Sequence, residues 1–198
     1  MELRQHNVIL KGQTIILRPM TENDWDILLK WNSDPDVLYY VEGDVVSSRT
    51  REEIQVIYRS VSQNAFCFII EFQDDPIGEC WLQKMNLERI LQKYPRVDCR
   101  RIDLMIGDKT LWGRGIGTEV IGLLTTFGLE QADFVFGCDI ANYNVGSQKA
   151  FQKAGYQLAD ETQQPSEAKA HYCLDFVLGR ERFKSLQSSQ TQSRPSTM

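Results

Sequence analysis

A glycine-dense turn at residues 113–118, with the sequence GRGIGT, constrains the fold of this 198-residue chain more than any other segment. A strand-like apolar run at 102–106 precedes it, and an amphipathic, helix-like run at 118–129 follows it. Glycines leave backbone N–H groups uncovered, the first turn of a helix has unpaired N–H groups, and the helix dipole adds about half a positive charge there. The sequence therefore predicts a strand–turn–helix unit that binds a phosphorylated ligand.

The spacing of the glycines excludes two familiar phosphate-binding motifs. No Gly-Lys-Ser or Gly-Lys-Thr follows the turn, so it is not a nucleotide-binding P-loop. Gly113 and Gly115 also lack the third glycine that a dinucleotide-binding fingerprint places three residues later. A plain tight turn between a strand and a helix is the alternative that this segment alone leaves open.

Strand-like and helix-like segments alternate along the rest of the chain. We expect strands at residues 14–20, 65–72, 76–85, 97–106, 134–138, 156–159 and 171–178. We expect helices after the capping boxes Thr21/Asp24 and Thr50/Glu53, after the glycine turn, and between an N-cap at Asn144 and a C-cap at Gly155. The strands on either side of the glycine-turn helix should be parallel neighbours, so we predict an α/β (α+β) domain with a mixed sheet.

The strand that leads into the glycine turn has two chemically different faces. Its side chains alternate, so Ile102, Leu104 and Ile106 share one face and Asp103 and Met105 share the other. The second face therefore carries a carboxylate just upstream of the predicted anion site.

The length and termini indicate one domain. We expect an N-terminal extension at residues 1–12 with a frayed His6, a single domain at 13–182, and a disordered tail at 183–198 that is rich in Ser, Gln and Thr. The chain has no signal-peptide pattern and no apolar run long enough to cross a bilayer, so we expect a cytoplasmic protein.

Composition excludes several classes of function. The net charge of -5 argues against a nucleic-acid or membrane partner and fits a cationic small substrate. The five cysteines are scattered without any Cys-x-x-Cys and are expected to be reduced, packed thiols. With only two histidines, the chain offers too few ligands for a metal site, so we expect none.

The glycine turn and the order of elements resemble the GNAT superfamily of N-acetyltransferases over residues 12–180, and most closely its aminoglycoside 6'-N-acetyltransferase branch. The shared features are Leu17-Arg18-Pro19, Trp31 with Asp34, Val37 and Leu38, Pro76-Ile77-Gly78, Lys84-Met85, Asp103 ten residues before Gly113, Asp139 five residues before Asn144, and the segment AFQKAGY at 150–156. The resemblance implies a mostly antiparallel sheet with a central parallel strand pair and flanking helices.

The resemblance also implies a set of site residues. Acetyl-CoA is the expected co-substrate, with its pyrophosphate held at Arg114, Gly115, Ile116, Gly117 and Thr118, its pantetheine arm along Leu104, Met105 and Ile106, and a further contact at Asn144. A simple N-cap is the other interpretation of Asn144. For a cationic acceptor we expect Asp103, Asp139, Glu79, Trp81 and Glu42 to form the pocket.

Asp103 occupies the position of the base proposed in the family. An alkyl amine of pKa about 10.4 must lose a proton before it attacks a thioester, and an ordinary aspartate is a weak acceptor, so we expect Asp103 to orient the ammonium and relay its proton through water. The alternative is a structural ion pair between Asp103 and Arg100 or Arg101.

One residue departs from the family pattern. Many members have a tyrosine, thought to protonate the leaving thiolate, where this chain has Phe151. Tyr143 and Tyr172 are candidate replacements, with solvent as a third source of the proton.

The sequence thus predicts an acetyl-CoA-dependent N-acetyltransferase that modifies the 6'-amine of an aminoglycoside and confers antibiotic resistance, as a monomer or homodimer. Two alternatives remain open: acetylation of another amine (a polyamine, a protein N-terminus or a siderophore intermediate), and a non-catalytic acyl-CoA-binding module.

Overall fold

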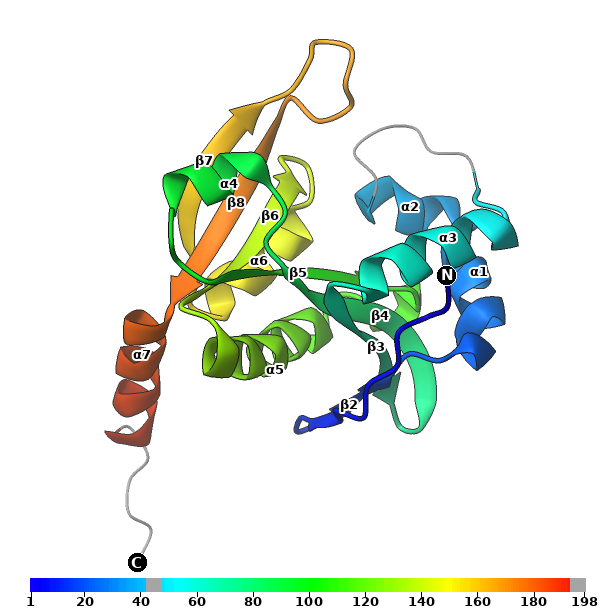
Figure 1. The fold of residues 1–198 in the computed structure, drawn as a ribbon, viewed down its shortest axis with the longest axis horizontal. Helices are drawn as coiled ribbons and strands as arrows, with labels where there is room; N and C mark the ends of the chain where they lie inside the picture. The colour runs from blue at the N-terminus through cyan, green and yellow to red at the C-terminus, as the bar shows by residue number, and fades with distance from the viewer. Residues whose placement is uncertain (42–47, 193–198) are drawn as a thin grey trace, which may run out of the picture.

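The computed structural model describes residues 1–41 and 48–192, which form one mixed sheet flanked by helices (Figure 1). The described strands lie in the order β1-β2-β3-β4-β5-β6-β8-β7. Their bounds are β1 (Leu10–Lys11), β2 (Ile15–Pro19), β3 (Ala65–Phe72), β4 (Asp75–Lys84), β5 (Cys99–Ile106), β6 (Phe134–Ala141), β7 (Gln157–Gln163) and β8 (Tyr172–Gly179). The helices are α1 (Trp25–Trp31), α2 (Pro35–Val41), α3 (Arg51–Ser62), α4 (Glu88–Lys93), α5 (Ile116–Gln131), α6 (Val145–Lys153) and α7 (Arg180–Gln192), with 3-10 turns η1 (Glu22–Asp24) and η2 (Lys109–Leu111).

Side-chain alternation along the strands divides the core between the two faces of the sheet. Ile102 of β5 packs in a cluster with Val120 and Leu124 of α5, whereas Met105 packs in another with Leu28 of α1 and Ile54 of α3. The predicted alternation along β5 is therefore confirmed. Helices α5 and α6 cover one face, and α1, α2 and α3 cover the other.

The capping boxes predicted from sequence are both present. The hydroxyl of Thr21 accepts from a backbone N–H at the start of η1, and the Asp24 carboxylate accepts from the Thr21 N–H at 2.7 Å. Thr50 and Glu53 make the same reciprocal pair at the start of α3, with the Thr50 N–H 2.7 Å from a Glu53 carboxylate oxygen. Each box pairs N–H groups that the helix itself leaves without partners.

The two strands that flank α5 are parallel, as predicted, but they stay paired over only part of their length. The β5–β6 register runs from Cys99↔Phe134 to Ile102↔Gly137, although β5 continues to Ile106 and β6 to Ala141. Past this point β6 carries an irregularity between Gly137 and Ile140 in its pairing with β8. The sheet therefore opens between the carboxyl ends of β5 and β6.

The N-terminal residues are more ordered than predicted. Leu3 is only 4% exposed and belongs to the cluster that includes Trp25. His6 packs edge-on against Phe66 and Phe68, and its Nε2 lies 2.9 Å from the carbonyl oxygen of Cys67. The expectation of a frayed His6 is wrong, because the histidine ring is anchored to β3 by packing and a hydrogen bond.

Helix α7 lies where the sequence suggested a disordered tail. The tail was expected from residue 183, yet the chain is helical to Gln192, and residues 193–198 lie outside the described part. Phe183 and Leu186 pack against the core from this helix. Two apolar contacts one turn apart supply the burial that composition alone did not reveal.

The five cysteines are buried free thiols. Burial raises the pKa of Cys67 to about 12 and that of Cys99 to about 11, so both stay protonated near neutrality.

No helix in the described ranges is both long and apolar enough to span a lipid bilayer.

Phe151 anchors α6 to the sheet and should be among the most costly side chains to truncate. Its buried ring stacks on the Phe176 ring of β8, with the ring centroids 6.2 Å apart, and meets the Tyr156 ring edge-on, with the centroids 5.0 Å apart. We predict that Phe151→Ala lowers the free energy of unfolding by about 3–5 kcal/mol, measured by urea denaturation. The matched control is Leu158→Ala, at a 57% exposed position, which should change little; equal effects would contradict this assignment.

Candidate functional site

The glycine turn presents open backbone at the start of α5. Gly113 and Gly115 have φ of +75° and +86°, a left-handed conformation that other residues rarely adopt, and a side chain added at either would meet nothing within 4 Å. Gly115 is the N-cap of α5, and no side chain caps this helix. Its first N–H groups are therefore available to an anion, with the helix dipole in their favour.

A cleft of about 530 Å³ lies beside this turn. Of the residues predicted to bind the cofactor, those that line it are Leu104, Met105, Ile106, Gly115, Ile116, Gly117, Thr118 and Asn144. The exposed Arg114 is not among its lining residues. Lys149 and Lys153, one turn apart on α6, also line the cleft and bring positive charge to it. They were not predicted, although their four-residue spacing in the helix after Asn144 indicates that they share one helix face.

The free edge of β5 forms part of the cleft wall. The Gly107 N–H donates to the Ile77 carbonyl near the start of β4, so strand alternation turns the polar backbone groups of Leu104 and Ile106 toward the diverging β6. The Ile106 carbonyl already accepts from Trp112 Nε1 at 2.8 Å. An extended ligand can therefore use Leu104 and the Ile106 N–H as it would a neighbouring strand.

A smaller cavity of about 270 Å³ adjoins the cleft where the sheet splits. Four of the residues predicted to bind the acceptor line it together: Glu79, Trp81, Asp103 and Asp139. Tyr40, Leu104 and Asn144 line both spaces, so the two are continuous. The fifth predicted residue, Glu42, lies outside the described residues.

Asp103 is held by two neighbours on the sheet. The Arg101 guanidinium donates to its two oxygens at 2.9 and 2.7 Å, and Trp81 Nε1 donates to one of them at 2.9 Å. The ion pair considered from sequence is thus present with Arg101, while Arg100 pairs with Asp98. Asp103 nevertheless lines the smaller cavity, so it combines an ion pair with access to that space.

Glu79 lies deeper in the same cavity and has different electrostatics. It is 3% exposed, and burial, together with the negative charge of Asp103, raises the pKa of its carboxyl well above 4.5, against an opposing hydrogen bond from Tyr58. Asn32 in turn donates to the Tyr58 hydroxyl at 3.2 Å. The other oxygen, Oε2, has no hydrogen-bond partner among the described residues. Burial therefore disfavours the charged form of Glu79, and one of its oxygens has no partner among the described residues.

Asp139 belongs to a network that crosses three elements. It has a φ of 55°, and its N–H donates to Asp175 at 3.0 Å. Arg89 of α4 bonds both the Asp139 carboxylate, at 2.8 Å, and the buried carboxylate of Asp175 on β8. Sequence reasoning missed Arg89 and Asp175, because no local pattern connects positions so far apart.

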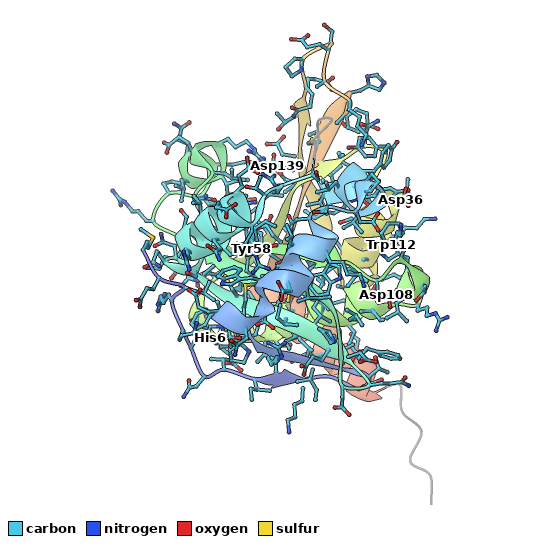
Figure 2. All side chains as sticks on the ribbon, turned by 90° about the vertical axis from the view of Figure 1, so that its right-hand side faces the viewer. His6, Asp36, Tyr58, Asp108, Trp112 and Asp139 are labelled. Atoms are coloured by element: carbon cyan, nitrogen blue, oxygen red, sulfur yellow. The ribbon has the colours of Figure 1, made fainter. Side chains whose placement is uncertain are left out.

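Aromatic rings border the two spaces on the side of α2. The centroid of the Tyr40 ring lies 5.5 Å from that of Trp112 and 4.9 Å from that of Tyr39. The Tyr39 and Tyr143 ring centroids are 5.2 Å apart. In Figure 2, Asp139 lies above Trp112, toward the β7–β8 hairpin at the top of the view. Asn144 caps α6 through Ser147 and donates to the Tyr40 carbonyl at 3.1 Å, so its predicted capping role is confirmed.

The tyrosines considered as proton donors occupy different positions. Tyr143 lines the larger cleft, whereas Tyr172 of β8 lines neither space. In the described ranges, no group of three or more His, Cys, Asp or Glu side chains is arranged to hold a metal ion.

Comparison with known proteins identifies the family. The Acetyltransferase (GNAT) domain family model matches residues 14–157. The structure of aminoglycoside acetyltransferase AAC(6')-Ib in complex with coenzyme A matches with a TM-score of 0.69 at 16% identity, over 88% of this chain and 99% of that one. The same enzyme with ribostamycin and coenzyme A matches with a TM-score of 0.69 at 16% identity, over 93% of this chain and 100% of that one.

Two further solved structures have the same fold. A GNAT-family acetyltransferase from Bacillus anthracis matches with a TM-score of 0.68 at 13% identity, over 88% of this chain and 99% of that chain. An uncharacterized protein from Bacillus halodurans matches with a TM-score of 0.75 at 14% identity, over 97% of this chain and 98% of that one. This chain therefore belongs to the GNAT acetyltransferase family and is an N-acetyltransferase.

The raised pKa of Glu79 should make stability depend on pH. An acid with a higher pKa in the folded state binds its proton more tightly when folded, so the free energy of unfolding falls as pH rises from about 4.5 toward the folded pKa. We predict that Glu79→Gln removes this decline, so that the variant gains stability relative to the wild type with rising pH. Urea denaturation across this range measures it, and a difference that is constant with pH would contradict it.

Proposed function

We propose that this N-acetyltransferase transfers the acetyl group of acetyl-CoA to the 6'-amine of an aminoglycoside, by direct attack in a ternary complex, and so confers antibiotic resistance. The observation that carries the proposal is the pair of continuous spaces at the split between β5 and β6. One offers backbone donors and lysines, and the other offers carboxylates and aromatic rings. The enzyme acts as a monomer or homodimer and needs no metal.

The larger cleft takes the coenzyme. Its pyrophosphate binds the N–H groups of residues 115–118, where the helix dipole favours negative charge, and Lys149 and Lys153 add positive charge from α6. The exposed Arg114 contributes chiefly its N–H. The pantetheine arm lies along the open edge of β5 and bonds Leu104 and Ile106, with Asn144 at the junction of the two spaces.

The smaller cavity takes the acceptor amine. The alkylammonium is attracted by Asp103 and Asp139, whose charges are only partly offset because Arg89 is shared between Asp139 and Asp175. Asp103 orients the amine, and its proton leaves through water. Burial disfavours the charged form of Glu79, so it attracts a cation less than the two aspartates do, and its unpartnered oxygen accepts a hydrogen bond from the amine.

Direct attack is supported by the chemistry of the only thiol that lines the smaller cavity within the described residues. Burial raises the pKa of Cys138, so it stays protonated and is a poor nucleophile. After the acetyl group leaves, the coenzyme thiolate takes a proton from Tyr143 or from solvent, since Phe151 has none to give. A thiol pKa near 8.5 makes this step undemanding.

A second candidate function is acetylation of an amine with fewer charges, such as a protein N-terminus or a siderophore intermediate. The arginine partners of Asp103 and Asp139 favour it, because they reduce the negative charge that a polycationic sugar would meet. A non-catalytic acyl-CoA-binding role remains the alternative of a different class.

Incubation with kanamycin and acetyl-CoA, followed by location of the added acetyl group, separates these functions. Acetylation at the 6'-nitrogen with release of thiol is the expected result. Acetylation of peptides without any of kanamycin would favour the second candidate, whereas acetylation of polyamines without any of kanamycin would replace the aminoglycoside by another polycationic acceptor. Tight acetyl-CoA binding without thiol release for any amine would favour the binding module.

The lysines of α6 should contribute to coenzyme affinity. We predict that Lys149→Gln and Lys153→Gln each raise the Kd for coenzyme A by about two- to fivefold, and that the effect shrinks at high salt because the side chains are exposed. Calorimetric titration measures it. Lys184→Gln, at an exposed lysine of α7, is the matched control; an equal effect there would place the coenzyme elsewhere.

Asp103 should matter for turnover beyond its ion pair. We predict that Asp103→Asn lowers kcat by about 10² or more, measured by thiol release under saturating acetyl-CoA. Asp98→Asn removes another aspartate that is paired with an arginine two residues away, and it should leave kcat unchanged. A near-normal rate for Asp103→Asn would remove this residue from the mechanism.

A further inference from the structure

Lys169 places its ammonium group in an aromatic setting beside the proposed acceptor cavity. It lies in the connection between β7 and β8, and its Nζ is 3.2 Å from the centroid of the Tyr39 ring and 4.4 Å from that of Tyr143. The Tyr39 carbonyl accepts from Nζ at 2.5 Å. The ring and carbonyl of Tyr39 and the ring of Tyr143 thus contact one cation, an arrangement that binds ammonium groups in general.

Charge pairing does not account for this position. Within residues 1–41 and 48–192, no carboxylate forms an ion pair with Lys169. The surroundings instead desolvate the ammonium, which lowers the pKa of Lys169. Tyr39 also remains 48% exposed, and the adjacent Tyr40 42%. Among the described residues, the ammonium of Lys169 is therefore held by aromatic rings and a carbonyl and not by a carboxylate.

The rings connect this place to the cavity. Tyr39 contacts Tyr40, which lines both the cleft and the acceptor cavity, and Tyr143 lies two residues beyond Ala141 in the cavity wall. Tyr143 itself lines the larger cleft, and Tyr39 reaches both spaces through Tyr40, so the Tyr39/Tyr143 pair lies next to the junction of the cleft and the proposed acceptor cavity.

We propose that Tyr39 and Tyr143 form a cation-binding subsite for a second ammonium group of the acceptor, and that Lys169 occupies this subsite until such an acceptor displaces it. The inference rests on the proposed function, because it assigns the smaller cavity to the acceptor. A displaced Lys169 side chain moves into solvent at little cost, whereas the acceptor's second ammonium gains the rings and the Tyr39 carbonyl. The enzyme therefore selects acceptors with two separated cationic groups.

Removing the competing lysine provides the direct test. The probes are 1,5-diaminopentane and its monoamine counterpart 1-aminopentane, titrated calorimetrically into the full-length protein saturated with coenzyme A. We expect Lys169→Met to lower the Kd for the diamine by about two- to thirtyfold and to leave the monoamine unchanged. Equal changes for both amines, or none, would overturn the subsite.

The aromatic pair is tested in the same assay with a conservative replacement. In the Lys169→Met background, Tyr39→Phe keeps a ring and should keep the tighter diamine binding, whereas Tyr39→Leu should lose it. If both substitutions act alike, the rings do not bind the cation and Lys169 is only a structural contact. Lys184→Met is the control for the loss of a lysine elsewhere.

Failure of this inference and failure of the proposed function give different results. Binding does not require turnover, so a diamine preference without thiol release for any amine would reject the catalytic proposal and keep the subsite. Thiol release, combined with equal affinity for both amines in the wild type and in Lys169→Met, would keep the catalytic proposal and reject the subsite.

Discussion

The separation of β5 from β6 is the constraint on which the site depends. Parallel strands need a crossover connection, here through α5, so the turn that starts this helix must lie at the carboxyl end of β5. Their register stops at Ile102↔Gly137, and the turned backbone at Asp139 takes β6 away from its neighbour. The free edge of β5, the open N-terminus of α5 and the carboxylate face of the sheet therefore meet at one opening.

The three acids at this opening differ because their neighbours differ. Asp103 and Asp139 each pair with an arginine, which limits the net negative charge of the cavity. Glu79 has no cation among its described contacts, and the charge of Asp103 adds to burial in raising its pKa. The pairing of Asp103 with Arg101 thus fixes the Asp103 carboxylate where its charge raises the pKa of the second acid, Glu79.

Local features of the sequence could be predicted, and features that join distant segments could not. The glycine turn, the alternation at 102–106 and the capping boxes at Thr21 and Thr50 are set by neighbouring residues, so the chain shows them directly. The Arg89–Asp175 contact joins positions 86 residues apart. The helix beyond residue 183 depends on Phe183 and Leu186 meeting a core that other segments build. Composition and local pattern therefore indicate neither the Arg89–Asp175 contact nor this helix.

Phe151 shows how packing and chemistry compete for one position at this opening. Its ring lies so close to β6 that a Cβ added at Gly137 would come within 2.3 Å of it, which a glycine alone permits. The same ring lines the smaller cavity and stacks on Phe176. Here the side chain anchors α6 beside the cavity and supplies an apolar wall. Any proton for the leaving thiolate must come from elsewhere, and Tyr143, on the loop that leads into α6, lies on the cleft that would hold this thiolate.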